Sequence, residues 1–249
     1  MVDYYKQIFK RKSFHFFKDR LDLKDDELNK LNNFIKNIKP LDKDIKTLIK
    51  IVKEEETSCK RGGEYCLLFY SEKSGNYLRN IGYIGEQIDL YLASQNIGAL
   101  WYGIGKPKDM VVDGLDFVIM ISFAKMNEDR FRKDMFKSKR KKLEETWFGD
   151  TLGVGEIVRF TPSACNTQPW ICENTGDELI IYRYKKPGKR GIMPAEKVRF
   201  YNKIDMGIYL FMLEVCLENE GYKFDRFIYE DNTCDEIEKT LIAKYVISK

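Results

Sequence analysis

Apolar residues recur at helical spacing in several stretches of the first half of the chain. The stretches that predict helices there cover residues 3–12, 25–38, 42–54 and 76–97. In the second of them, Asp25 or Asp26 fits the N-cap position and Pro40 marks the exit. Gly98 is expected to end the fourth and longest helix in a left-handed conformation.

Two runs in the same half are short, rich in aromatic residues and almost continuously apolar. They cover residues 65–70 and 117–123. Such runs are typical of strands that are buried on both faces, so each predicts a buried β-strand. Together with the helices, these strands favour an α+β fold.

The second half of the chain repeats this order of parts. Helices are predicted over 138–148 and 200–219, and strands over 179–184 and 226–229. Within the last helix, the run 208–213 is apolar on all sides, which indicates a buried helix. The recurring order indicates two similar α+β halves.

The least structured join between the halves lies in the polar stretch 124–137. We place the boundary there, which gives a first half over residues 1–130 and a second over 131–249. With 249 residues, the chain is long enough for each half to bury a core of its own.

The net charge of the chain argues against nucleic acid as a partner. The chain has 43 basic and 39 acidic residues, a net charge of +4, without the clustered basic face that nucleic-acid binding requires. The densest basic run, Lys139–Lys142, is interpreted as a solvated helix face, with anion binding as the alternative. No stretch reaches the roughly 20 apolar residues of a membrane span, and no signal peptide is apparent, so we expect a cytoplasmic protein.

The numbers and spacing of cysteine and histidine residues limit the kinds of active site that the chain can form. The six cysteines form no CxxC pair and His15 is the only histidine, so no metal site is expected. No phosphate-binding glycine motif of the P-loop or dinucleotide type is present. If the protein is an enzyme, a bound cofactor is expected to supply the reactive chemistry.

The segment Pro162–Trp170 (PSACNTQPW) is the most informative part of the chain. Its two prolines stiffen the backbone, and Ser163, Asn166 and Gln168 present hydroxyl and amide groups from a loop that suits a polar, ring-containing ligand. The alternative is a helix-to-strand turn whose amides satisfy the nearby backbone.

Three stretches together resemble the FMN-dependent nitroreductase family. Arg11–Phe17 (RKSFHFF) is similar to that family's N-terminal Arg-Arg-Ser-x-Arg-x-Phe motif. Ala93–Gly105 resembles the end of its central helix and the loop beyond. Pro162–Trp170 is similar to its Pro-Ser-x-x-Asn-x-Gln-Pro-Trp loop. The resemblance implies a nitroreductase-like α+β fold.

The positions of these motifs differ from the usual order, in which the Pro-Ser loop follows the N-terminal motif closely. Family members are dimers whose FMN lies at the subunit interface, with one motif from each subunit. Here the first half carries the Arg-Ser motif and the second carries the Pro-Ser loop, with a basic echo at Lys137–Arg140. The resemblance therefore implies a fused, single-chain pseudo-dimer with one composite FMN site.

The resemblance also implies which residues bind the cofactor. They are Arg11, Lys12, Ser13, His15, Trp101, Tyr102, Gly103, Arg140, Pro162, Ser163, Ala164, Asn166 and Gln168. Arg11 would meet the FMN phosphate, and His15 replaces a basic residue that reaches the pyrimidine edge of the flavin. A backbone N–H of the Leu100–Gly103 loop would face flavin N5. No protein side chain is expected to be catalytic, because the flavin carries the chemistry.

The implied function is an oxidoreductase that passes hydride from NADH or NADPH through FMN to a nitroaromatic or quinone-like small molecule. Lys12 and His15 weaken the N-terminal motif, so an FMN-binding protein without turnover, serving storage or sensing, is the first alternative. A nucleic-acid or anion-binding module built on Lys137–Lys142 is the second. Because a fused pair can build its own pocket, either a monomer or a homodimer is expected.

Overall fold

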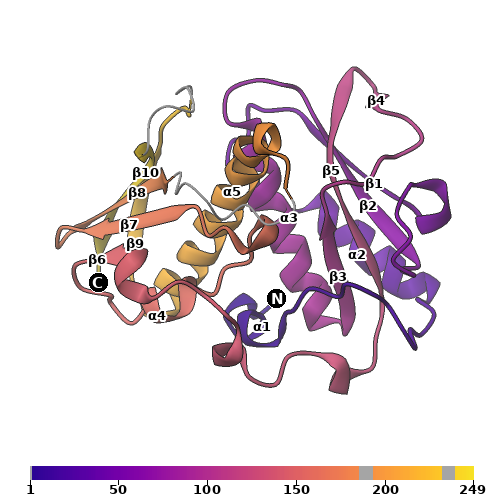
Figure 1. Cartoon of the computed structure of the whole chain (residues 1–249), viewed down its shortest axis with the longest axis horizontal. Helices are drawn as coiled ribbons and strands as arrows, with labels where there is room; N and C mark the ends of the chain where they lie inside the picture. Colours follow the sequence, from indigo (N-terminus) through magenta and orange to yellow (C-terminus); the bar gives the residue numbers. More distant parts are fainter. Residues whose placement is uncertain (1, 185–192, 232–238) are drawn as a thin grey trace. The chain divides into compact units, whose positions relative to one another are not determined.

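The computed structural model describes residues 2–184, 193–231 and 239–249 (Figure 1). The chain divides into two compact units. Unit 1 comprises residues 1–77 and 84–135, and unit 2 comprises residues 78–83 and 136–249. Each unit combines helices with a largely antiparallel sheet, so the α+β prediction is confirmed.

Unit 1 is built on a five-stranded sheet in the order β1-β2-β5-β3, with β4 paired to β5. Its strands are β1 (Thr47–Lys53), β2 (Tyr65–Ser71), β3 (Ile97–Tyr102), β4 (Val111–Val112) and β5 (Leu115–Lys125). All neighbouring pairs run antiparallel. The central strands β2 and β5 are buried along most of their length, as their continuous apolar sequences predict.

The helices of unit 1 surround this sheet (Figure 1). They are α1 (Tyr4–Lys10), α2 (Asp25–Lys36) and the unit 1 part of α3 (Tyr77–Ser94), with 3₁₀ turns η1 (Glu54–Glu56) and η2 (Glu128–Arg130); η3 (Met135–Lys137) begins at the end of the unit. The helices predicted over 3–12, 25–38 and 76–97 are confirmed. The N-cap of α2 is Lys24 rather than Asp25 or Asp26, because the Glu27 carboxylate accepts the Lys24 backbone N–H.

Two predictions in unit 1 were wrong. The stretch predicted as a helix over 42–54 contains β1, because its β-branched residues pair with β2 along the whole strand. Gly98 does not cap a helix: α3 ends at Ser94, and Asn96 adopts the left-handed conformation with φ 55°. Gly98 lies within β3, where a Cβ would come within 2.8 Å of the Phe14 ring. Glycine is therefore required there by close packing.

Unit 2 is built on a second five-stranded sheet, in the order β6-β7-β8-β10-β9. Its strands are β6 (Trp147–Phe148), β7 (Trp170–Asn174), β8 (Glu178–Tyr184), β9 (Lys223–Ile228) and β10 (Lys239–Ser248). Its helices are α4 (Gly155–Val158) and α5 (Ala195–Asn219), with 3₁₀ turns η4 (Leu143–Glu145) and η5 (Ala164–Asn166). The helix predicted over 200–219 and the strand predicted over 179–184 are confirmed.

Two further predictions failed in unit 2. Residues 138–148 do not form a helix but hold only η4 and β6, because the backbone at Lys139 and Lys141 is hydrogen-bonded to a distant loop. The strand predicted over 226–229 is β9, but the prediction of two strands for this half was incomplete. Sequence reasoning missed β10, which pairs with both β8 and β9.

The short α3 segment Leu78–Tyr83 belongs to unit 2 and packs closely on α5. A Cβ added to Gly82 would collide with the Ile204 carbonyl, and one added to Gly207 would collide with the Arg79 carbonyl. Glycine at both positions therefore lets the two backbones approach within contact distance. The Tyr83 hydroxyl also donates a 2.6 Å hydrogen bond to the buried Glu214 carboxylate of α5.

Candidate functional site

The N-terminal motif of unit 1 runs alongside strand β3. Ser13 forms a parallel bridge with Ala99, and the Phe14 N–H donates to the Ala99 carbonyl at 3.0 Å. The rings of Phe14 and Phe17 then enter a buried apolar cluster with Leu100. These contacts hold the motif beside β3, the strand that contains Trp101 and Tyr102.

Arg11 is buried and its charge is matched inside unit 1. Its Nε donates to Oδ2 of Asp89 at 2.8 Å, and Nε1 of Trp101 donates to the same oxygen at 3.0 Å. Burial alone would lower the pKa of Arg11, but the carboxylates of Asp89 and Glu86 outweigh that effect and raise it. Arg11 therefore joins the N-terminal motif to α3 and β3 from within.

A second carboxyl group, that of Glu86 on α3, lies beside this pair. It is fully buried, and neither carboxylate oxygen has a hydrogen-bond partner among the described residues. Burial and the neighbouring Asp89 raise its pKa well above the ordinary value. Of the two carboxyl groups beside Arg11, that of Asp89 forms the ion pair with it.

Cationic side chains crowd around the motif on the side of Lys12. Burial, Arg130 and Arg132 lower the pKa of Lys12. Burial and then Arg11 lower the pKa of Arg132 to about 10. Ser13 is half-buried and His15 is exposed. The motif therefore brings several basic groups together, and these groups repel one another. An anion bound beside them would reduce this repulsion.

The segment expected as a loop near flavin N5 is part of a strand. Leu100, Trp101 and Tyr102 lie in β3, which pairs with β5 through Tyr102. Tyr102 is half-buried and the Arg61 guanidinium lies 5.4 Å from its ring centre. Gly103 follows the strand in a turn and is half-buried. Sequence reasoning missed this strand because it extended the preceding helix to residue 97.

The Pro162 loop of unit 2 has a strained backbone. Within four residues, Cys165, Asn166 and Gln168 adopt positive φ angles of 49°, 57° and 50°. Such conformations are uncommon for residues other than glycine and persist only where surrounding contacts impose them. Pro162, Ser163 and Ala164 are half-buried, and Cys165 and Asn166 are exposed.

Hydrogen bonds from Lys139–Lys141 impose this shape. Nη1 of Arg140 donates to Oδ1 of Asn166 at 3.1 Å, and Nδ2 of Asn166 donates to the Lys139 carbonyl at 3.1 Å. The Lys141 N–H donates to Oε1 of the buried Gln168 at 2.8 Å, while the Gln168 N–H donates to Oγ of Ser163 at 3.0 Å. Unit 2 thus brings these predicted residues together. The contacts also fit the alternative that the loop amides satisfy the nearby backbone.

Asp205 of α5 supports the same loop and was missed by sequence reasoning. Its Oδ1 accepts the Ala164 N–H at 2.9 Å, and its Oδ2 lies 3.5 Å from the Thr167 hydroxyl. Burial raises its pKa to about 8, although both hydrogen bonds act in the opposite direction. The signal in the sequence was one acidic residue shortly before the apolar run 208–213 of a predicted buried helix.

None of the helices within the described ranges is both long enough and apolar enough to cross a membrane.

Comparison with known proteins identifies the family. The family model described as "Putative TM nitroreductase" matches residues 3–216. The crystal structure of a "putative nitroreductase" from Thermotoga maritima has 20% identity and a TM-score of 0.62, covering 99% of this chain and 94% of its own. That likeness shows a nitroreductase-like fold.

Solved structures of smaller proteins match about half of the chain. A nitroreductase family protein from Clostridium difficile has 12% identity and a TM-score of 0.42, covering 58% of this chain and 95% of its own. A "Putative NADH dehydrogenase/NAD(P)H nitroreductase" from Parabacteroides distasonis has 14% identity and a TM-score of 0.40, covering 57% of this chain and 99% of its own. A search of curated proteins finds no match. On the family match over residues 3–216, the chain belongs to the nitroreductase family described as "Putative TM nitroreductase".

Proposed function

We propose that this nitroreductase binds FMN and transfers electrons from NADH or NADPH to a nitroaromatic or quinone-like acceptor. FMN supplies hydride and electron transfer at its N5 edge when bound. The observation that carries the proposal, beyond family membership, is the crowding of basic groups around the N-terminal motif of unit 1.

The donor set of unit 1 fits a phosphate dianion. Lys12 and Arg132 each have a pKa lowered by burial and by neighbouring cations, and a dianion beside them would relieve that repulsion. Arg11 is already paired with Asp89, so it acts as a positioning residue that holds the motif. Lys12 and the Ser13 hydroxyl are the groups proposed to meet the phosphate.

The Pro162 loop of unit 2 is proposed to support the flavin ring. Its backbone is held rigid by Arg140, Gln168 and Asp205, which favours binding of a flat ligand without ordering a loop. Half-buried Pro162 and Ala164 would offer apolar surface to the ring. The exposed Asn166 would offer its amide to a polar flavin atom.

We further propose that the chain is a fused pseudo-dimer and that one FMN per chain uses both motifs. This part of the proposal is supported by the resemblance of Arg11–Phe17 and Pro162–Trp170 to motifs that come from two subunits in family members. It predicts one bound FMN per chain and loss of binding on substitution of either motif.

Flavin titration tests both parts of the proposal. The purified protein should bind one FMN per chain, and NADH or NADPH should reduce it rapidly without oxygen. Lys12→Met and Asn166→Ala should each weaken FMN binding about tenfold, the loss expected for a hydrogen bond worth about 1.4 kcal/mol. Lys36→Met, on the exposed face of α2, is the matched control and should bind normally.

Three outcomes would decide against parts of the proposal. Protein that takes up no FMN rejects it entirely. Normal binding by the Asn166 variant rejects the role of the Pro162 loop. Tight FMN binding without reduction by either nicotinamide favours storage or sensing over catalysis.

A further inference from the structure

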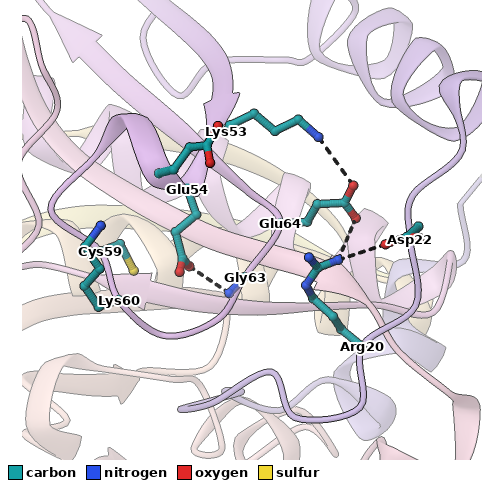
Figure 2. A pocket seen from close by; sticks show the side chains of 9 residues that line it. Arg20, Asp22, Lys53, Glu54, Cys59, Lys60, Gly63 and Glu64 are labelled. Carbon is teal, nitrogen blue, oxygen red and sulfur yellow. Dashed lines mark hydrogen bonds and ion pairs between the residues drawn. The ribbon is translucent and has the colours of Figure 1, made fainter.

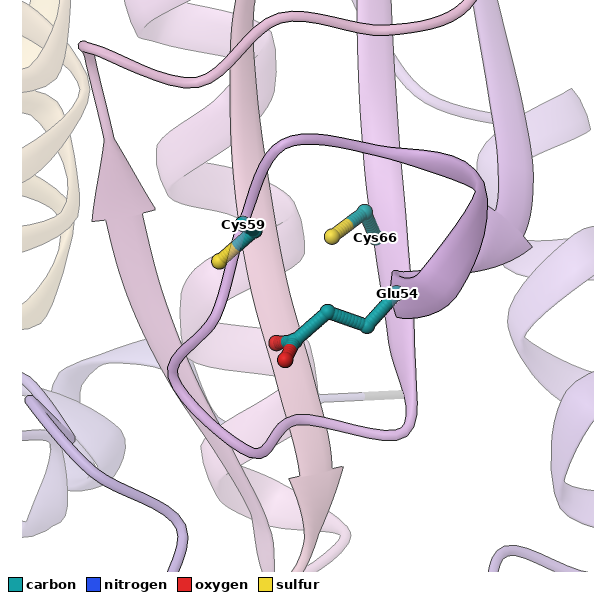
Figure 3. Close-up of side chains that lie close together, drawn as sticks. All are labelled: Glu54, Cys59 and Cys66. Carbon is teal, nitrogen blue, oxygen red and sulfur yellow. The ribbon is translucent and has the colours of Figure 1, made fainter.

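Unit 1 contains a buried group of two thiols and a carboxylate. Glu54 begins η1, Cys59 lies in the following loop, and Cys66 lies on β2. Their potential ligand atoms all lie within 4.8 Å of one another (Figure 3). Both cysteines have no exposed surface and Glu54 is 8% exposed. None of the three belongs to the proposed flavin site.

The Glu54 carboxylate is held in place by surrounding donors. Oε1 accepts the Gly62 N–H at 2.9 Å, and Oε2 accepts the Gly63 N–H at 2.8 Å and the Ser122 hydroxyl at 2.7 Å. These bonds orient the carboxylate without using all of its lone pairs, as outer-shell partners do for metal ligands. A ligand atom held this way loses little freedom when a cation binds.

Thr57 contacts both thiol-bearing residues. The Cys59 N–H donates to Oγ1 of Thr57 at 3.1 Å, and the same hydroxyl lies 3.8 Å from Sγ of Cys66. Thr57 therefore keeps both sulfur-bearing residues beside Glu54.

A surface pocket of about 450 Å³ leads to this group (Figure 2). Glu54, Cys59 and Gly63 are among its lining residues, together with Lys60 and Glu64. Glu64 itself is paired with Arg20 at 3.4 Å and Lys53 at 3.6 Å. The pocket offers a path by which a small cation can reach Glu54 and Cys59.

We propose that Glu54, Cys59 and Cys66 form a binding site for a thiophilic divalent cation of the zinc type. Two sulfur ligands and one oxygen ligand suit such a cation, and the pocket can supply water as the fourth ligand. Binding replaces the two thiol protons, which pass to solvent, with two metal–sulfur bonds.

The geometry requires only small movements. Tetrahedral coordination with Zn–S of about 2.3 Å and Zn–O of about 2.0–2.2 Å places ligand atoms about 3.5–3.8 Å apart. The present separations, at most 4.8 Å, therefore need to shrink by about 1.3 Å or less. The absence of a CxxC pair argued against zinc because that test considers only closely spaced cysteines, whereas Cys59 and Cys66 are seven positions apart and the third ligand, Glu54, is a carboxylate.

Metal titration of the full-length, reduced protein tests the site. Wild-type protein should bind one Zn²⁺ in competition with a chromophoric chelator, and Co²⁺ should give the visible and thiolate charge-transfer bands of tetrahedral coordination. Cys59→Ala and Cys66→Ala should each weaken Zn²⁺ binding by at least about 100-fold, and Glu54→Gln by about tenfold or more. Cys216→Ala, which removes an equally buried thiol from α5, should bind Zn²⁺ normally.

A measurement on the wild type guards against variants that do not fold. Zn²⁺ should slow alkylation of Cys59 and Cys66, mapped by mass spectrometry, and leave that of the exposed Cys165 unchanged. The proposal is overturned if wild-type protein binds no Zn²⁺ beyond the Cys59→Ala level. It is equally overturned if Zn²⁺ fails to protect both thiols. Neither result bears on FMN binding.

Discussion

Nε of Arg11 lies 2.8 Å from Oδ2 of Asp89, in an ion pair whose side chains are 5% and 2% exposed. The same carboxylate oxygen accepts the indole N–H of Trp101. The first basic residue of the N-terminal motif is therefore part of the core of unit 1. Substituting it tests stability as well as cofactor binding, which is why Lys12 is the better probe of the phosphate.

Arg11→Met should destabilise the protein by about 3–5 kcal/mol, because it leaves the Asp89 charge buried without its partner. Urea unfolding measures the loss. The double variant Arg11→Met/Asp89→Asn should recover much of it, since asparagine keeps an acceptor for Trp101 and carries no charge. A double variant as unstable as the single one would contradict this account.

Asp205 should make stability depend on pH. Its pKa rises from the ordinary 3.8 to about 8 in the folded protein, so the native state holds this proton more tightly than the unfolded chain. The resulting stability is fully present below about pH 4 and is lost as pH rises toward 8. Asp205→Asn should flatten this part of the pH profile of unfolding free energy. An unchanged slope between pH 4 and 8 would show that the carboxyl titrates normally.

The close approach of α5 to residues 78–83 should not tolerate a methyl group. Gly82→Ala should destabilise the protein by about 1–3 kcal/mol or more, because the obstacle is the Ile204 backbone carbonyl and not a movable side chain. Gly155→Ala in α4 is the matched control: its new Cβ would meet side chains at 3.1 Å or more. Equal effects in thermal or urea unfolding would argue against the predicted clash.

Gln168 should contribute to stability by closing the Pro162 loop. Gln168→Ala should cost about 1–3 kcal/mol, since it leaves the Lys141 N–H without its side-chain acceptor. The exposed Gln95→Ala variant should change stability by less than about 0.5 kcal/mol. Urea unfolding of both variants makes the comparison. A loss in the Gln168 variant no larger than in the control would mean that the loop keeps its shape without this side chain.

The local sequence was sufficient to predict a helix or strand wherever a single apolar pattern runs through the whole element. The apolar runs of β2 and β5 predict buried strands, and the all-round apolar run of α5 predicts a buried helix. The Pro162–Trp170 motif and the Arg11–Phe17 motif together led to the correct family.

Other features depended on partners far away in the chain. The stretch 138–148 does not form the predicted helix because its backbone bonds to Asn166 and Gln168. The stretch 42–54 contains a strand because β2 lies beside it.

The sequence alone determined the motifs that indicate the family and the apolar patterns that predict the central strands and the buried helix. Only the tertiary structure paired Arg11 with Asp89 and gathered Glu54, Cys59 and Cys66. The physical reason is that periodicity and propensity act over a few residues. Ion pairs and ligand sets depend instead on distances in space, which are decided when the sheets and helices pack.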